Sequence, residues 1–191
     1  YKGVLILNGK QTNSISPLLD ETQIQYQIQK LTANLGMSFT GSIALGDGFI
    51  LERNDAIELI NKNSKNKDVL FPYINGVDLN SSPNQEPSRW AIYFYDWSIE
   101  KAKEYPDCFS IIEEKVYPVR RDNKDKQRRE IWWRFTRPTI DLYLAIKDLS
   151  QVLAVAFTSR TLAFTFLPKG IIYPNSLVVF AFAKNGGRRT P

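Results

Sequence analysis

Short apolar runs separated by turn-forming residues dominate the first half of the chain. Residues 3–7 (GVLIL) are typical of a short strand, and the alternation across residues 38–51 predicts two short strands broken at residues 46–48 (GDG). Residues 69–73 (VLFPY) predict a buried strand, and residues 89–95 (RWAIYFY) predict an aromatic one. We therefore expect several short strands before the middle of the chain.

A helical period governs the middle of the chain. Asn54 and Ser98 can each cap a helix, and Pro106 can end one helix and begin the next. The predicted helices span residues 54–61, 98–105, 106–117, 127–135 and 139–149.

The last quarter of the chain is rich in β-formers. Four runs, at residues 152–158, 162–167, 171–173 and 177–183, are separated by connections too short for a crossover. They predict a C-terminal antiparallel meander that packs on the earlier strands. The fold class predicted for the chain is thus α+β, with a mixed or antiparallel sheet and a central group of helices.

Two polar stretches interrupt this pattern. Residues 8–34 carry few large apolar side chains and resemble a linker or a long surface crossing, which we expect to be the least ordered part. Residues 74–88 are dense in turn formers and predict a loop. We expect an N-terminal strand and linker at 1–37, one domain at 38–183 and a tail at 184–191.

Composition excludes several classes of protein. The chain has 191 residues, with 43% apolar and 24% charged, which is ordinary for a globular domain in an aqueous compartment. It has no apolar run near the roughly 20 residues of a membrane span and no signal-peptide pattern, so we expect no membrane partner and a cytoplasmic location. Because the chain begins at Tyr1 and ends at Pro191 just after a strand-like run, we expect it to be a piece of a longer protein.

The single cysteine and the absence of histidine limit the chemistry. Cys108 cannot form an internal disulfide, and without histidine there is no Cys/His metal cluster and no imidazole base. We therefore expect no metal site and no catalytic residues in this chain.

Positive charge is concentrated in residues 115–137. That window holds nine Lys and Arg against three Asp and Glu, a net charge of +6, whereas the whole chain carries +5. It also contains Trp132 and Trp133, which on a helix would point about 100° apart, so that one would be core and the other would support the basic surface. The pattern fits a surface for a polyanion, and it also fits a solvated helix face whose Arg stems cover core tryptophans.

Weaker candidate sites can be weighed against structural roles. Residues 46–48 lack the third glycine of a dinucleotide loop, so a turn is favoured. Asp107, Glu113 and Lys115 faintly resemble a metal nuclease but follow a helical period, so a surface helix is favoured.

Two loops offer polar groups to a ligand. Asn75, Asp78 and Asn80 could contact a ligand, although such residues populate loops for backbone reasons alone. Ser159 and Arg160 sit at a tight strand junction that could present a guanidinium to a guanine edge or a phosphate, or could leave it idle.

An ordered series of short motifs supports a more specific hypothesis. They are residues 46–51 (GDGFIL), 68–80 (DVLFPYINGVDLN), 87–90 (PSRW), 105–106 (YP), the block from Arg128-Arg129 to Trp132-Trp133, and residues 157–160 (FTSR). In this order the chain resembles, over roughly residues 38–183, the target-recognition domain of MmeI-type restriction-modification enzymes and related adenine-specific DNA methyltransferases.

The resemblance implies a module that reads duplex DNA. The parent enzyme would be an adenine-specific methyltransferase, in many members also a magnesium-dependent endonuclease, with S-adenosylmethionine bound by a separate methyltransferase domain of the same chain. This sequence departs from that domain, because residues 71–73 (FPY) lack the Asn-Pro-Pro run and no cofactor glycine motif is present. Whether the parent methylates, cleaves or does both therefore stays open.

Two sets of residues are the candidate DNA contacts. The phosphates would be held by Arg120, Arg121, Lys124, Lys126, Arg128, Arg129 and Arg134. The family pattern directs base readout to Ser159, Arg160 and Lys169, with Arg160 as the first candidate.

Three other functions remain open. An RNA-binding module would use the same charges and aromatic rings on single strands or loops. A metal-dependent nuclease would use Asp107, Glu113 and Lys115, and a protein-interaction domain would turn its basic face to an acidic partner.

Overall fold

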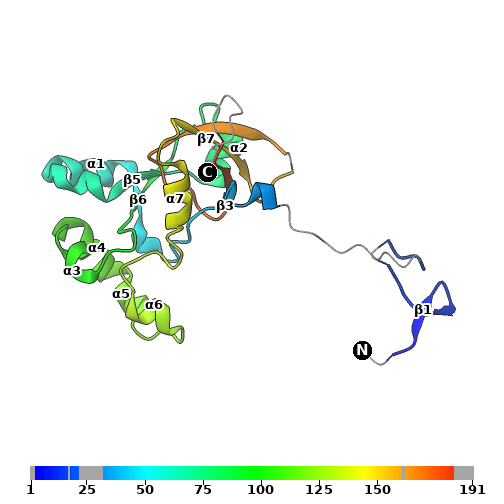
Figure 1. The fold of residues 1–191 in the computed structure, drawn as a ribbon. Helices are drawn as coiled ribbons and strands as arrows, with labels where there is room; N and C mark the ends of the chain where they lie inside the picture. The colour runs from blue at the N-terminus through cyan, green and yellow to red at the C-terminus, as the bar shows by residue number, and fades with distance from the viewer. Residues whose placement is uncertain (1–2, 17, 22–31, 161, 183–191) are drawn as a thin grey trace. The chain divides into compact units, whose positions relative to one another are not determined.

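The computed structural model describes residues 3–16, 18–21, 32–160 and 162–182. The chain divides into two compact units, Tyr1–Ala33 and Asn34–Pro191 (Figure 1). The candidate site residues of the sequence all belong to the second unit.

The first unit contains a β-hairpin where a linker was expected. Strands β1 (Leu5–Leu7) and β2 (Lys10–Thr12) pair antiparallel across Asn8 and Gly9. Both turn residues have positive φ, at 51° and 77°, as a two-residue Asn-Gly hairpin turn requires. The interpretation of residues 8–34 as a linker is thus wrong at its start; much of the stretch expected to be least ordered, residues 22–31, lies outside the described residues.

The second unit contains a four-stranded antiparallel sheet. Its order is β3 (Ser38–Thr40), β9 (Leu177–Phe180), β7 (Gln151–Ala156) and β8 (Phe164–Pro168). The predicted meander is wrong in one respect. In a meander β9 would pair with β8, but here β9 pairs with the edge of β7 opposite to β8. Packing on an earlier strand is confirmed by the pairing of β9 with β3.

Residues 171–173 explain this departure from a meander. They form no strand of the four-stranded sheet, and instead the Ile172 amide donates to the Pro72 carbonyl at 2.8 Å while Ile172 accepts from Ile74 at 3.3 Å. The segment thereby bridges to a second sheet before the chain returns as β9.

That second sheet has three antiparallel strands. Its order is β4 (Ile50–Glu52), β6 (Arg89–Ile92) and β5 (Leu70–Tyr73), as the strand patterns predict. Helix α1 (Arg53–Lys62), α3 (Ile99–Lys103) and α4 (Pro106–Lys115) share one hydrophobic core with this sheet (Figure 1). The short 3-10 turns Thr32–Asn34, Asp47–Phe49 and Ser64–Asp68 join the elements.

A separate core lies on one face of the four-stranded sheet. It is formed by α2 (Gly76–Ser81) and α7 (Ile140–Ile146) packed against β7, β8 and β9. Helix α2 lies where a loop was expected, because Asn75 and Asp78 form a capping box that nucleates it. The combination of helices and antiparallel sheets confirms the α+β class.

The helix predicted for residues 127–135 is shorter than expected. Helix α5 (Tyr117–Arg120) and helix α6 (Lys126–Glu130) bracket a turn, and the chain leaves the helix at Ile131 with φ −119° and ψ 46°. Trp132 and Trp133 therefore lie in irregular backbone, and both are 8% exposed. The expectation that one of them props the surface is wrong, since both rings belong to the core with α3 and α4.

A buried guanidinium holds this part of the fold together. Arg120 is 3% exposed, and its two terminal nitrogens donate to four backbone carbonyls and one hydroxyl. The acceptors are the carbonyls of Ala44 (2.6 Å), Leu45 (2.7 Å), Trp132 (2.9 Å) and Arg134 (2.6 Å) and Oγ1 of Thr136 (3.3 Å). Burial lowers the pKa of Arg120 to about 10, which leaves it charged at neutral pH.

We predict that Arg120→Met destabilises the fold strongly. The substitution keeps the apolar stem but leaves buried carbonyls without donors, so we expect a loss of about 3 kcal/mol in the free energy of unfolding. Arg120→Lys keeps the charge but lacks the planar fork, so its stability should lie between those of the wild-type chain and Arg120→Met. Urea unfolding measures the change, and Arg121→Met, at an exposed neighbour, is the matched control with an effect within about 0.5 kcal/mol. Equal losses for the two Met variants would contradict the assignment.

A second prediction concerns the cap of α2. Oδ2 of Asp78 accepts from the amides of Asn75 (3.1 Å) and Ser88 (3.3 Å), and Asp78 is 8% exposed. Asp78→Ala should therefore cost about 2 kcal/mol of unfolding free energy. Asn80→Ala, at an exposed position of the same helix, should change little in the same urea titration; a comparable loss there would show that α2 does not depend on its cap.

Candidate nucleic-acid interface

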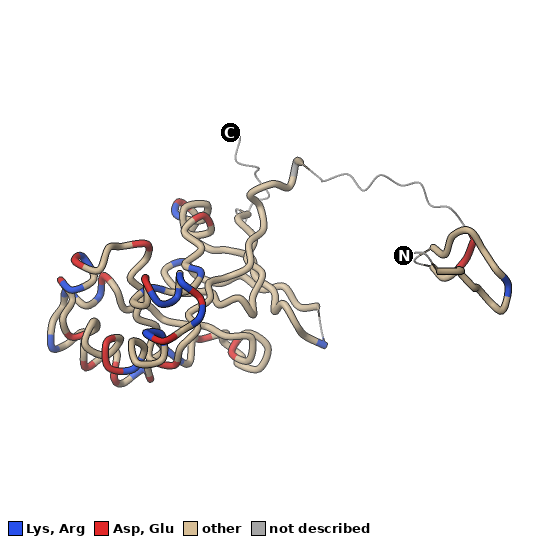
Figure 2. The backbone as a smooth tube through the Cα atoms, turned by 90° about the horizontal axis from the view of Figure 1, so that it is seen from below, with Lys and Arg blue, Asp and Glu red and all other residues tan. Residues whose placement is uncertain are grey.

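Five cations of the basic window lie in the turn after α5 and in α6, whereas the exposed Lys115 and Arg137 lie outside this stretch. We call residues 121–129 the basic turn; it carries Arg121, Lys124, Lys126, Arg128 and Arg129 on a short stretch of backbone (Figure 2). Asp125 caps α6 by accepting from the amides of Gln127 and Arg128, which fixes the turn. The local backbone therefore presents most of the predicted phosphate-binding residues together.

Local acids neutralise part of this charge. Arg128 pairs with Asp125 at 3.2 Å, Arg121 with Asp122 at 3.1 Å, and Lys126 with Glu130 at 3.8 Å. Such exposed pairs are worth little in water, so a phosphate can compete for the cations at small cost. Arg129 instead donates to the Asn123 carbonyl at 2.8 Å, a contact that leaves its charge uncompensated.

Two of the predicted phosphate contacts have structural roles. The prediction is wrong for Arg120, because its guanidinium is buried and occupied by backbone carbonyls. Arg134 is half-buried, donates to the Asp96 carbonyl at 2.7 Å and lies over the Trp133 ring at 5.6 Å. Its contacts are thus with the loop at Asp96 and with the Trp133 ring, while part of the side chain stays accessible.

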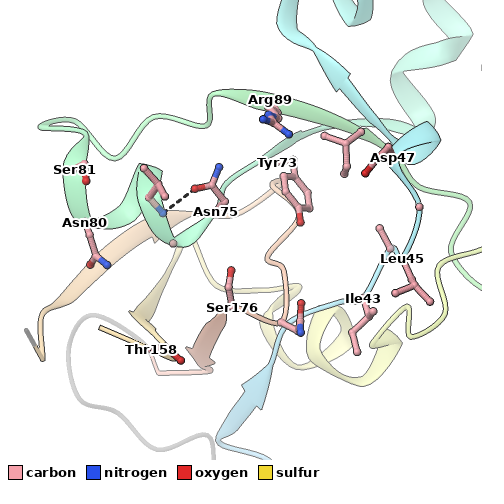
Figure 3. Close-up of a pocket in the computed structure, with 16 residues that line it drawn as sticks. Ile43, Leu45, Asp47, Tyr73, Asn75, Asn80, Ser81, Arg89, Thr158 and Ser176 are labelled. Carbon is pink, nitrogen blue, oxygen red and sulfur yellow. Dashed lines mark hydrogen bonds between the residues drawn. The ribbon is translucent and has the colours of Figure 1, made fainter. Parts of the chain in front are cut away.

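A cleft of about 810 Å³ opens between α2, residues 43–47 and the start of β9. We call it the α2 cleft; Figure 3 shows Asn75, Asn80, Arg89, Thr158 and Ser176 around it. Its lining mixes amide, hydroxyl and guanidinium groups with apolar surface. Such an open polar concavity can offer both donors and acceptors to the edge of a base.

Asn75, Asp78 and Asn80, the predicted loop contacts, have different roles around this cleft. Asn75 and Asn80 line it, although the Asn75 side chain accepts from the amides of Val77 and Asp78 as a helix cap. Asp78 does not serve as a ligand contact, because it is buried and holds two backbone amides. Of these three residues, Asn80 is thus the one whose side chain is exposed at the cleft.

The β7–β8 loop reaches the same region. Thr158 lines the cleft, and Nδ2 of Asn80 lies 3.5 Å from Oγ of Ser159. Arg160 is exposed beside them. The structure therefore brings together two stretches, around Asn80 and Ser159, that the sequence separates by 79 residues.

Lys169 lies at the other end of the hairpin. It follows β8 directly, while Ser159 and Arg160 precede it, and the strand between them spans roughly 17 Å at about 3.3 Å per residue. The candidate base-reading residues are therefore brought together only in part.

Sequence reasoning missed Arg89 and Tyr73, which face each other at the register position where β5 pairs with β6. Both line the α2 cleft, and burial raises the pKa of Tyr73 while the charge of Arg89 acts in the opposite direction. Arg89 lies in the motif at residues 87–90 (PSRW), and that motif was the sequence feature that could have indicated it as a site residue. Its position on a rigid strand makes it a better-placed donor than a loop residue.

The α2 cleft and the basic turn share one supporting segment. Residues 44–47 line the cleft, and the carbonyls of Ala44 and Leu45 accept from Arg120 at the end of α5. The glycine at 48 follows from close packing, since a Cβ there would lie 2.6 Å from Cβ of Lys115. Gly48 therefore serves close packing on α4, while Gly46 takes a positive φ of 145° that favours glycine.

The residues of the nuclease alternative do not form a metal site. Asp107 pairs with Lys62 and accepts from Asn66 at 3.2 Å, and these hydrogen bonds lower its pKa. Among the residues that the structure describes, no three His, Cys, Asp or Glu gather where they could hold a metal ion. None of the described helices is long and apolar enough to cross a bilayer.

Comparison with known proteins identifies the fold. No protein-family model matches this chain, and no curated protein matches its sequence. Among solved structures, the fold is similar to part of the type IIL restriction-modification enzyme MmeI in complex with DNA, with a TM-score of 0.62 and 15% identity. The match covers 92% of this chain and 23% of the MmeI chain, so the fold is one found within a restriction-modification enzyme.

Proposed function

We propose that this chain is the target-recognition domain of a restriction-modification enzyme, a module that binds duplex DNA and leaves catalysis to other domains. The observation that carries the proposal is the fold match with MmeI, a protein whose structure includes DNA, over 92% of the chain. The basic turn supplies independent support, because clustered cations are the electrostatic signature of a phosphate-binding surface.

The parent enzyme follows from the same proposal. We place S-adenosylmethionine and the adenine-specific methyl transfer in a methyltransferase domain of the same chain, and any magnesium-dependent cleavage in a further domain. The residues 46–48 and 71–73 of this chain do not fit such a cofactor, since the first pack on α4 and the second are paired with β6. The enzyme would act in the cytoplasm.

DNA contacts divide between two surfaces. The cations of the basic turn would hold phosphates without regard to sequence, and their paired acids would limit the strength of that grip. Arg160, Asn80 and Arg89 would read base edges from the α2 cleft and its rim, as amide and guanidinium groups do with adenine and guanine.

The basic turn gives the first test of this function. We expect R128Q/R129Q to weaken duplex binding uniformly across sequences and to reduce the slope of log affinity against log salt by up to about 2, because roughly 0.9 counterions are released per phosphate contact. Fluorescence anisotropy with a labelled duplex at several salt concentrations measures both quantities. The matched control is R53Q/K103Q, which removes two exposed cations from α1 and α3. An unchanged slope in R128Q/R129Q would refute phosphate binding by this turn, and a competition with single-stranded RNA separates the RNA-binding alternative.

A second test separates the base-reading candidates. Since β8 spans roughly 17 Å, or about five base pairs at 3.4 Å each, Arg160 and Lys169 cannot read the same base pair. Selection of bound duplexes from a random pool should show that Arg160→Ala relaxes one or two positions by about 1–3 kcal/mol each. Lys169→Ala should change positions several base pairs away or none. Loss of preference at the same position in both variants would contradict this arrangement.

A further inference from the structure

The outer face of the four-stranded sheet carries a row of aromatic side chains. Alternation places Val152, Ala154 and Leu167 on the face covered by α2 and α7, so Phe164 and Phe166 of β8 project from the opposite face. Phe164 is 50% exposed and Phe166 is 43% exposed. The described residues therefore leave this face open.

Neighbouring strands extend the row. Phe180 of β9 lies 5.7 Å from Phe164, and Phe182 stacks on Phe180 at 5.8 Å with an interplanar angle of 12°. We call Phe164, Phe166, Phe180 and Phe182 the aromatic face. Phe164 is tilted by 54° against Phe180, so the rings form a contiguous aromatic patch, unlike the isolated exposed side chains that are normal on a protein surface.

Charge around the aromatic face favours a polyanion. The strands β3, β7, β8 and β9 carry no acidic side chain. Within the described residues from 149 to 182, the charged side chains are Arg160 and Lys169, both cations. Arg160 and Lys169 stand exposed just before and just after β8.

We propose that the aromatic face binds single-stranded nucleic acid by stacking unpaired bases on Phe164, Phe166 and Phe180. Base–aromatic stacking is worth about 1–3 kcal/mol per base and tolerates any sequence, while the flanking cations neutralise phosphates. Phe164 and Phe166 are two strand residues apart, roughly 6.6 Å, about twice the 3.4 Å between stacked bases of a duplex. The aromatic face thus suits bases that have been pulled apart, and it is separate from the basic turn.

A protein partner is the competing occupant of the aromatic face, since interfaces between proteins are also enriched in aromatic side chains and poor in charged ones. Stacking, in contrast, needs a π-face, so replacing Phe by Leu separates the two cases at nearly constant apolar surface.

The experiment compares two labelled 12-mers bound to the full chain: oligodeoxythymidine and an abasic strand with the same phosphates. We expect the thymidine strand to bind more tightly, and F164L/F166L to reduce its affinity roughly tenfold or more. F164W/F166W should retain the affinity, and Ile57→Thr, which alters an apolar residue of α1 that is 38% exposed, should leave it unchanged. Thermal unfolding checks that the variants remain folded.

Two results would overturn the proposal. One is equal affinity for the two strands or unchanged binding by F164L/F166L. The other is sedimentation of the wild-type chain as a dimer that F164T/F166T dissociates, which would assign the face to a second copy. Duplex binding measured with R128Q/R129Q is independent, so failure of one site does not imply failure of the other.

Discussion

A single buried guanidinium determines how the irregular part of this fold is organised. Arg120 donates to carbonyls from residues 44–45 and from residues 132–134, two segments that form neither helix nor strand and would otherwise bury unpaired acceptors. An arginine suits this position because its planar fork serves several acceptors at once and its guanidinium lies over the Phe49 ring, with Cζ 4.9 Å from the ring centroid. The exposed cations that follow it in sequence depend on this anchor for their position.

The anchor also explains why the α2 cleft and the basic turn belong to one structural unit. Residues 44–47 contribute to the cleft wall on one side and receive the Arg120 hydrogen bonds on the other. Leu45 takes a positive φ of 50°, a costly conformation for a residue other than glycine, and it persists where the surroundings fix it. A shift of α5 would therefore move the cleft wall together with the basic turn.

Elements set by local signals could be predicted from the sequence, and elements set by distant contacts could not. Ser98 correctly marked the start of α3, and the β7–β8 hairpin followed from two apolar runs and a short connection, whereas Asn54 does not cap α1, which begins at Arg53 after Glu52. The departure of residues 171–173 from the meander depends on a partner 100 residues earlier, which periodicity does not encode. Arg120 was indistinguishable from its exposed neighbours for the same reason, because burial in this segment is decided by carbonyls from elsewhere.

The distribution of charge argues for a defined orientation on nucleic acid. Residues 115–137 carry +6 and residues 149–191 carry +5, while the whole chain carries +5, so the remaining residues sum to −6. Phosphates are attracted to the two positive regions and repelled by the rest, which includes Asp107, Glu113 and Glu114 of α4. A field divided in this way restricts the approach of a polyanion before any specific contact forms, and under the proposed function base readout would fall to short-range groups such as Asn80, Arg89 and Arg160.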